Sequence, residues 1–326
     1  MNVLVTGGAG YVGSVCTEAL LERGHRVVVV DDLRTGHREA VPEGAVFVHA
    51  DVADPDLVGV ALEEHGVEAI VHFAASSLVG ASMEQPLDYF ENNVIGALRL
   101  WRTAARHGVR KVVVSSTAAL YGTPDSVPIP ETAPLHPESV YGETKLQLER
   151  TLEWLTRTAG FGAVALRYFN AAGASEVRGE DHRPESHLIP IVLQVAAGAR
   201  PHVAIYGDDY PTPDGTAIRD YVHVADLAEA HVAALEAVAP GTMRAYNLGN
   251  GQGYSVREVV DVVRRVTGRD VATTQAPRRA GDPPVLVADA AAARRDLGWT
   301  PRRPDLERIV GDAWAWHRAH PEGYPA

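Results

Sequence analysis

The sequence predicts an α/β fold: a doubly wound parallel sheet joined to a second, smaller α/β lobe. Short apolar runs alternate with longer helical patterns through the first half of the chain. The runs are almost continuous in Val, Ile and Ala, as expected for strands that helices cover on both faces. Such alternation implies right-handed crossovers in a parallel sheet. Strands are predicted at 2–6, 26–30, 45–49, 69–73, 111–115 and 162–167, and helices at 11–23, 56–65, 83–107 and 139–159.

The alternation stops after Arg167. Residues 171–220 are rich in Gly, Pro and Asp, and helical patterns recur near 188–198 and at 224–237, 256–266 and 306–320. We therefore expect one lobe over 1–170 and a smaller, discontinuous lobe over most of 171–326. The helix at 224–237 is expected to return to the first lobe.

Composition narrows the class of protein. The 326 residues include 30 Lys and Arg against 42 Asp and Glu, a formal net charge of −12, and 46% are hydrophobic. These values argue against a disordered chain and against nucleic acid as a partner. No apolar run approaches the roughly 20 residues that cross a bilayer, so no membrane partner is expected. No secretory signal is visible and Cys16 is the only cysteine, which favours a cytoplasmic location.

A glycine-rich turn follows the first predicted strand, with glycines at 7, 10 and 13. A tight turn, close approach of a diphosphate to the backbone, and packing of a helix on a strand each exclude a side chain. The diphosphate then meets free N–H groups at the positive end of the helix. Its place between a strand and a helix predicts a dinucleotide-binding (Rossmann) turn.

Asp31 and Asp32 follow the second predicted strand, near the spacing of about 20 residues at which an acid binds the adenosine ribose. A carboxylate there repels a 2′-phosphate, so NAD is favoured over NADP, although Arg34 and Arg38 could accommodate that phosphate. Asp51 and Val52 follow the third strand, where an adenine contact is expected; Asp51 could instead cap the next helix.

Tyr141 and Lys145 lie four residues apart in a helical pattern, so both face the same way. An ammonium about 4 Å from the phenol, at an effective dielectric of about 20, favours the phenolate by about 4 kcal/mol. The positive nicotinamide ring of NAD would add to this effect, and the two charges together qualify Tyr141 as a general base near neutral pH. Thr117 ends the fifth predicted strand, and its hydroxyl can bond the reacting oxygen and relay a proton to Tyr141.

The segments VLVTGGAGYVGS, SSTAALYG, YGETK, LRYFNAAGA, YGDDYPTPDGTAIRDYVHVADLA and APRRAGDPP resemble the UDP-glucose 4-epimerase family of extended short-chain dehydrogenases/reductases. The resemblance covers essentially the whole chain. It implies reversible C4 epimerisation of UDP-glucose and UDP-galactose through a 4-keto intermediate, with tightly bound NAD as the transient hydride acceptor. It also implies a homodimer through helices 83–107 and 139–159. The alternative is a 4-epimerase of UDP-GlcNAc and UDP-GalNAc, or of a UDP-pentose or UDP-hexuronate.

The resemblance also assigns site residues, and it assigns no metal ligands. The catalytic residues are Thr117, Tyr141 and Lys145. The same three and the following would contact NAD: Gly7, Gly10, Tyr11, Val12, Gly13, Asp31, Asp32, Leu33, Arg34, Thr35, Gly36, Asp51, Val52, Phe73, Ala74, Ala75, Ser77, Asn92 and Phe169. Besides Thr117 and Tyr141, the UDP-sugar would be held by Asn170, His187, Leu188, Ala204, Tyr206, Arg219, Tyr221, Arg279, Asp282 and Leu286.

Three positions depart from the family pattern. Ser77 stands where some members have lysine, and His187 where others have asparagine beside the nucleotide. Leu286 stands where a bulky tyrosine can wall the sugar pocket, and the smaller side chain leaves room for an N-acetyl group. A competing 4,6-dehydratase reaction needs an acid pair after the strand-end threonine. Thr117 is followed by two alanines, which exclude it.

Overall fold

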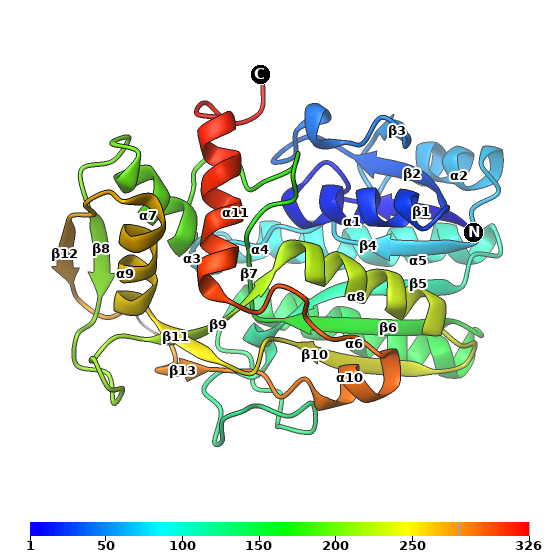
Figure 1. Ribbon diagram of the computed structural model, residues 1–326. Coiled ribbons are helices and arrows are strands. Elements are labelled where there is room, and N and C mark those ends of the chain that lie inside the picture. Colours follow the sequence, from blue (N-terminus) through cyan, green and yellow to red (C-terminus); the bar gives the residue numbers. More distant parts are fainter. Residues whose placement is uncertain (280, 326) are drawn as a thin grey trace.

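The computed structural model describes residues 1–279 and 281–325, and its central feature is a seven-stranded parallel sheet (Figure 1). The strand order is β10-β6-β5-β4-β1-β2-β3, so the first strand lies inside the sheet and the chain winds outward on both sides of it. This confirms the predicted fold class. The strands are β1 (Asn2–Thr6), β2 (Arg26–Asp31), β3 (Val46–His49), β4 (Ala69–His72), β5 (Lys111–Thr117), β6 (Gly162–Tyr168) and β10 (Met243–Leu248).

Helices cover both faces of this sheet. On one face, α1 (Tyr11–Glu22), α8 (Val224–Ala237) and α10 (Ala291–Leu297) share a hydrophobic cluster with the strands. On the other face, α2 (Pro55–Glu64), α5 (Gly96–Arg106) and α6 (Val140–Thr158) form a second cluster. The helix at 224–237 therefore packs against the first lobe. So do β10, which follows it directly, and α10, which comes later in the chain.

The helix predicted over 83–107 is not continuous. The structure has α3 (Val79–Glu84), α4 (Pro86–Tyr89), a π-helical segment (Phe90–Ile95) and then α5. The break falls at Gln85, whose backbone is not helical (φ −127°, ψ 58°), because the residue before a proline is driven out of the α region. The prediction of one regular helix here was wrong, whereas α6 matches the pattern predicted at 139–159.

A smaller lobe lies beside the carboxyl ends of the central strands (Figure 1). One sheet joins β7 (Asn170–Ala172), β9 (Ile218–His223), β11 (Gly253–Ser255) and β13 (Val285–Leu286), and β8 (Val203–Tyr206) pairs with β12 (Thr273–Ala276). The helices α7 (Leu188–Ala196), α9 (Val256–Thr267) and α11 (Leu306–Ala319) enclose a separate hydrophobic cluster. No helix among the described residues is both long and apolar enough to cross a membrane.

A buried ion pair joins α6 to β6 close to the carboxyl end of β5, the sheet edge at which Thr117 lies. The Arg167 guanidinium donates to both carboxylate oxygens of Glu149, at 2.6 Å for the shortest contact, and both side chains are almost fully buried. Glu149 also accepts from the Ser116 hydroxyl, and Arg167 donates to the Tyr121 hydroxyl. Neither charge can lose its partner without leaving the other uncompensated in a low-dielectric interior.

We therefore predict that Arg167→Met lowers the free energy of unfolding by about 3–5 kcal/mol, because it strands the Glu149 carboxylate. Arg157→Met is the matched control, since it removes the exposed Arg157–Glu153 pair of the same helix and should cost under about 1 kcal/mol. Urea denaturation of both variants measures the difference. Equal losses in the two variants would contradict the structural role given to the buried pair.

Candidate active site

The glycine turn between β1 and α1 leaves no room for side chains. Gly7 has a positive φ of 72°, and a Cβ there would lie 2.5 Å from the backbone nitrogen of Ala74. A Cβ on Gly13 would lie 2.1 Å from the Gly7 carbonyl oxygen. Gly10 precedes α1, which has no side-chain cap and no acidic residue in its first turn. The helix thus presents an uncapped positive end over an open backbone, which suits a diphosphate.

Asp31 ends β2 and ties the glycine turn to the next loop. One carboxylate oxygen accepts from the backbone N–H of Ala9 at 2.9 Å, and the other accepts from that of Leu33 at 2.9 Å. Burial raises the pKa of Asp31, although both backbone hydrogen bonds oppose the shift. The loop also packs on the turn, because the His37 N–H donates to the Ala9 carbonyl. The predicted ribose contacts, 31–36, are therefore placed beside the predicted diphosphate contacts.

A polar chain connects that loop to the segment after β4. Arg34 donates to Asp32 at 2.5 Å and to the Asn92 side-chain oxygen at 2.6 Å, and Asn92 donates to the Ser76 hydroxyl. Because the Arg34 guanidinium is already paired with Asp32 on its own loop, it is less available to bind the 2′-phosphate of NADP. Asp51 is exposed and accepts from the N–H of Ala53, while Asp54 caps α2.

Thr117, Tyr141 and Lys145 meet at the carboxyl end of β5. Ser139 caps α6, so Tyr141 lies in its first turn and Lys145 one turn later. The Thr117 hydroxyl is close enough to the Tyr141 phenol to lower the pKa of that phenol. The Lys145 ammonium is fully buried, donates to the Ser115 carbonyl at 2.9 Å, and lies 5.9 Å from the centre of the Tyr141 ring. The predicted trio is therefore brought together.

Burial dominates the electrostatics within the trio. Burial raises the pKa of Tyr141 to about 12, although the nearby Thr117 hydroxyl opposes the shift. Burial likewise lowers the pKa of Lys145 to about 8, opposed by the charge of Glu149. Lys145 by itself does not offset the burial of Tyr141, because desolvation penalises both charges and the ammonium is directed to the Ser115 carbonyl. The expectation from sequence counted the positive nicotinamide ring as well as Lys145, and that combination stays a prediction. A further positive charge is needed beside the phenol.

Tyr168 is a residue of this edge that sequence reasoning missed. It pairs in register with Thr117 across β5 and β6, and its hydroxyl hydrogen-bonds to the Ser115 hydroxyl at 2.6 Å. Its ring also lies 5.9 Å from that of His231 on α8, which in turn lies 4.6 Å from the ring of Phe73. Its position at a strand end, level with Thr117, was the signal that could have identified it.

Leu286 and Phe169 lie beside the catalytic edge. Both pack against the small cluster of Ala118, Tyr121 and Ile129 that directly follows Thr117. Leu286 also pairs with Arg219 between β13 and β9. Leu286, which is predicted to line the sugar pocket, and Phe169, which is predicted to contact the cofactor, therefore pack against the same cluster.

Two of the predicted substrate-binding residues, Arg279 and Asp282, line an open pocket of about 530 Å³ together with Tyr210 and Arg278. Arg219 forms an ion pair with Asp282, and the Arg279 guanidinium stacks over the Tyr206 ring, 4.0 Å from its centre. Forked, permanently charged donors of this kind suit a diphosphate. Ala204 lies on the same strand as Tyr206.

Two other predicted substrate residues lie on neighbouring strands of the small lobe. Asn170 on β7 is level with Tyr221 on β9. The Tyr221 side chain is buried in the lobe's hydrophobic cluster, and burial raises its pKa. Tyr221 therefore packs inside the lobe that carries Arg219, rather than in the pocket.

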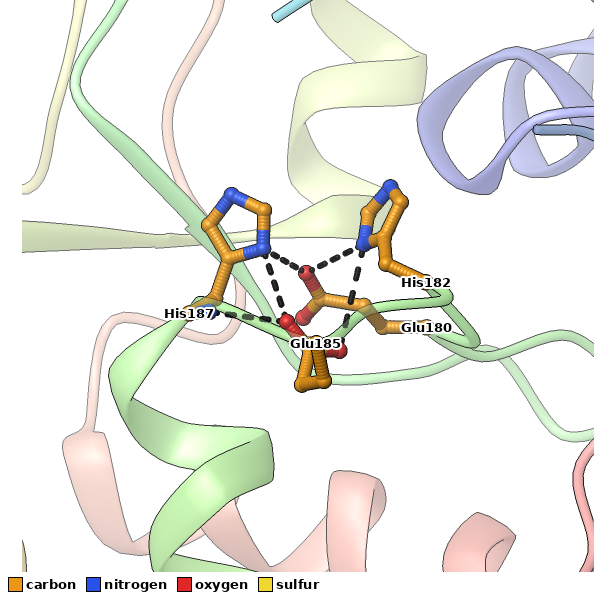
Figure 2. Close-up of side chains that lie close together, drawn as sticks. All are labelled: Glu180, His182, Glu185 and His187. Carbon is orange, nitrogen blue, oxygen red and sulfur yellow. Dashed lines mark hydrogen bonds and ion pairs between the residues drawn. The ribbon is translucent and has the colours of Figure 1, made fainter. Parts of the chain in front are cut away.

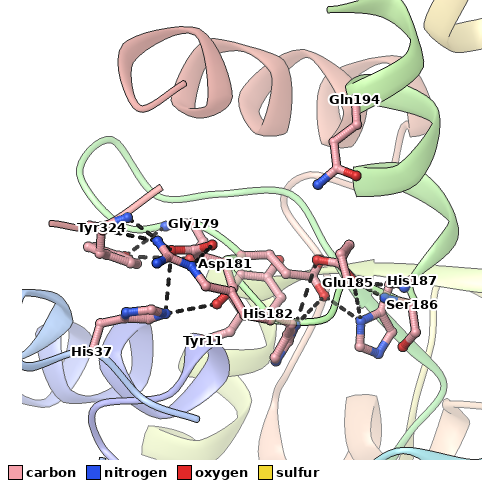
Figure 3. A network of polar contacts seen from close by, with 12 residues as sticks. Tyr11, His37, Gly179, Asp181, His182, Glu185, Ser186, His187, Gln194 and Tyr324 are labelled. Atoms are coloured by element: carbon pink, nitrogen blue, oxygen red, sulfur yellow. Dashed lines mark hydrogen bonds and ion pairs between the residues drawn. The ribbon is translucent and has the colours of Figure 1, made fainter. Parts of the chain in front are cut away.

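His187 lies at the start of α7, immediately before Leu188, in a cluster with Glu180, His182 and Glu185 (Figure 2). Its Nδ1 is 2.8 Å from Glu180 and 3.0 Å from Glu185. Burial opposes a charge on His187, but the two carboxylates outweigh it and raise its pKa to about 10. Figure 3 shows the same loop continuing through Asp181, which contacts His37 and Tyr324.

Comparisons with known proteins agree with this geometry. Residues 3–249 match the NAD dependent epimerase/dehydratase family. A UDP-glucose 4-epimerase of Halalkalibacterium halodurans is 51% identical over 99% of this chain and 98% of its own. The Brucella ovis UDP-glucose 4-epimerase in complex with NAD superposes with a TM-score of 0.92 at 45% identity, over 96% of this chain and 97% of that one.

The Bifidobacterium longum enzyme of the same name, in complex with NAD⁺ and UDP, superposes with a TM-score of 0.94 at 35% identity, over 99% of this chain and 100% of that one. Sequence and structure thus agree over the whole length of the chain. The glycine turn, the ribose-side carboxylate and the Thr-Tyr-Lys trio are the parts that such an enzyme needs. The chain belongs to the NAD dependent epimerase/dehydratase family, among its UDP-glucose 4-epimerases.

Proposed function

We propose that the protein interconverts UDP-glucose and UDP-galactose by inverting C4 of the hexose. The observation that carries this proposal is the meeting of Thr117, Tyr141 and Lys145 at the sheet edge that also bears the glycine turn. A base, a hydroxyl relay and a buried cation at that edge suit removal of a proton from a sugar hydroxyl. N-acetylated and other UDP-sugars are not favoured, because relatives near 50% identity carry the name UDP-glucose 4-epimerase.

NAD fits the residues present. The uncapped end of α1 would bind the diphosphate, Asp31 and Asp32 would bind the adenosine ribose, and Lys145 would bind the nicotinamide ribose. When bound, NAD supplies the hydride acceptor for C4 and returns the hydride to the opposite face. Its positive nicotinamide ring is also the charge that the trio lacks, since Lys145 alone leaves the pKa of Tyr141 near 12.

In the proposed mechanism, Tyr141 as phenolate takes the proton of the 4-hydroxyl, directly or through Thr117. C4 becomes a ketone when its oxygen loses this proton and its carbon loses a hydride, for which bound NAD would be the acceptor. Arg219, Arg279 and Asp282 hold the UDP moiety, so the 4-keto sugar stays tethered while the hexose turns over. Tyr141 then returns the proton to the oxygen on the inverted carbon. Firm binding of the nucleotide and loose binding of the hexose are both required for this reaction.

We also propose how the chain is organised around this reaction. Residues 1–170 with α8, β10 and α10 bind NAD, and the rest of 171–326 binds the UDP-sugar. The protein is proposed to work in the cytoplasm, in galactose metabolism, as a homodimer. Exposed apolar side chains on the helices of one face support the dimer: Leu87 on α4, Leu98 on α5 and Trp154 on α6.

Tyr141→Phe removes the hydroxyl that carries the proton and should lower kcat by at least about 10²-fold. Bound NAD, measured by absorbance after release from the protein, should be unchanged. Tyr254→Phe on β11, away from the catalytic edge, is the matched control and should keep full activity. Epimerisation at the wild-type rate by the Tyr141 variant would refute the role of the base.

Lys145→Met should slow the reaction and move its pH optimum upward. The phenolate form of Tyr141 is the active one, and a nearby cation lowers its pKa, so removing the cation raises that pKa. Activity of the variant then appears only at a higher pH than in the wild type. Rate profiles of both proteins over pH 6 to 10 test this. That range extends about two pH units on either side of the wild-type Lys145 pKa of about 8. An unshifted profile would count against the assignment.

The dimer proposal predicts that Leu98→Glu together with Trp154→Glu yields a monomer by light scattering, because carboxylates would be buried against the partner helices. A matched pair of changes on the small lobe, Arg269→Glu and Arg302→Glu, should leave the mass unchanged. A monomeric wild-type protein would overturn the proposal.

A further inference from the structure

The loop between β7 and α7 gathers two imidazoles and two carboxylates around one point (Figures 2 and 3). The four residues lie within eight positions of the chain: Glu180, His182, Glu185 and His187. One ligand atom from each lies within 4.8 Å of the others. No metal ligand is predicted from the sequence, and His187 is predicted there to contact the UDP-sugar.

The distances between the ligand atoms bracket those of a tetrahedral centre. His182 Nδ1 and His187 Nδ1 lie 3.1 and 2.8 Å from the same Glu180 oxygen. Glu185 offers one oxygen 3.0 Å from His187 Nδ1 and its other oxygen 3.9 Å from His182 Nδ1. Bonds of about 2.0–2.2 Å from a central Zn²⁺ place tetrahedral nitrogen and oxygen ligands about 3.3–3.5 Å apart. Small adjustments therefore convert these contacts into a coordination shell.

The charges of the cluster also favour a divalent cation. Glu180 and Glu185 are buried, and in the part of the chain that the structure describes their carboxylates are paired with no lysine or arginine. Two carboxylates and two neutral imidazoles around a divalent ion sum to zero charge. The ion would therefore replace the protonated His187 as the positive partner of the two acids and would balance both of them. His182 and His187 are partly exposed and leave the ion a path from solvent.

We propose that Glu180, His182, Glu185 and His187 bind a divalent first-row transition metal of the Zn²⁺ class. Imidazole nitrogen and carboxylate oxygen in a tetrahedral set are typical ligands of that ion. All four positions are filled by protein, so the site is structural, and the reaction at Tyr141 does not require it. The metal joins the loop to the start of α7, and so steadies Leu188, which the sequence analysis assigned to the nucleotide.

The test uses the full-length protein, dialysed against a chelator and then titrated with Co²⁺ as a spectroscopic probe. One equivalent should bind and give the intense visible absorption of tetrahedral Co²⁺, and Zn²⁺ should displace it with loss of colour. Zn²⁺ should also raise the Tm of the chelator-treated protein. Failure to bind one equivalent, or the weak pale-pink absorption of octahedral Co²⁺, would overturn the proposal.

Variants locate the ion. His182→Gln removes one ligand from a partly exposed position and should weaken Co²⁺ binding at least about tenfold. His202→Gln, an exposed histidine before β8, is the matched control and should bind as the wild type does. Circular dichroism confirms that each variant is folded. Unchanged affinity in His182→Gln and in Glu180→Gln would place the ion elsewhere and refute the assignment, whatever the epimerase activity proves to be.

Discussion

The hydrogen bond from the Lys145 ammonium to the Ser115 carbonyl is the contact on which the catalytic edge depends. It joins the first turns of α6 to the end of β5, and so places Tyr141 beside Thr117. It also holds a positive charge in the protein interior, where neighbouring potentials act strongly. Glu149, one helical turn further, favours the charged form of the lysine and is itself held by Arg167.

In this arrangement Thr117 and Lys145 alone do not make Tyr141 a base near neutral pH. Burial holds the pKa of Tyr141 near 12 in the protein by itself, so the phenol keeps its proton. In the proposed mechanism, the positive ring of a bound dinucleotide would lower this pKa, and proton removal would then depend on the presence of the oxidised cofactor. The cofactor thus supplies a charge to the base as well as a place for the hydride.

The sequence predicted the parts of the molecule that obey local rules. The six strands from Asn2 to Arg167, the glycine turn and the same-face placement of Tyr141 and Lys145 follow from periodicity, glycine geometry and helical spacing. The break at Gln85 was missed because the apolar pattern continues through Pro86. β10 was missed because its strand MRAYNL pairs with β6, far away in sequence, and shows little of the continuous Val and Ile of the others.

Three features of the site were beyond local reasoning. The direction of the Lys145 ammonium depends on the Ser115 carbonyl, which another element provides. The contact of Tyr168 with Ser115 likewise forms only when β6 pairs with β5. The Glu180 cluster lies within one loop, and residue spacing does not show that the path of this loop brings the four side chains to one point. Helical spacing shows that two side chains share a face, but it does not show where their charged ends point.

The most direct test of the central claim is a titration of Tyr141 itself, by ¹³C NMR of tyrosine labelled at Cζ, in the protein with and without NAD⁺. Comparison with Tyr141→Phe assigns the signal. The account predicts a pKa near 12 without the cofactor and a marked fall toward neutrality when it is bound. A Tyr141 pKa that is the same in both states would contradict the proposal that the bound cofactor completes the base.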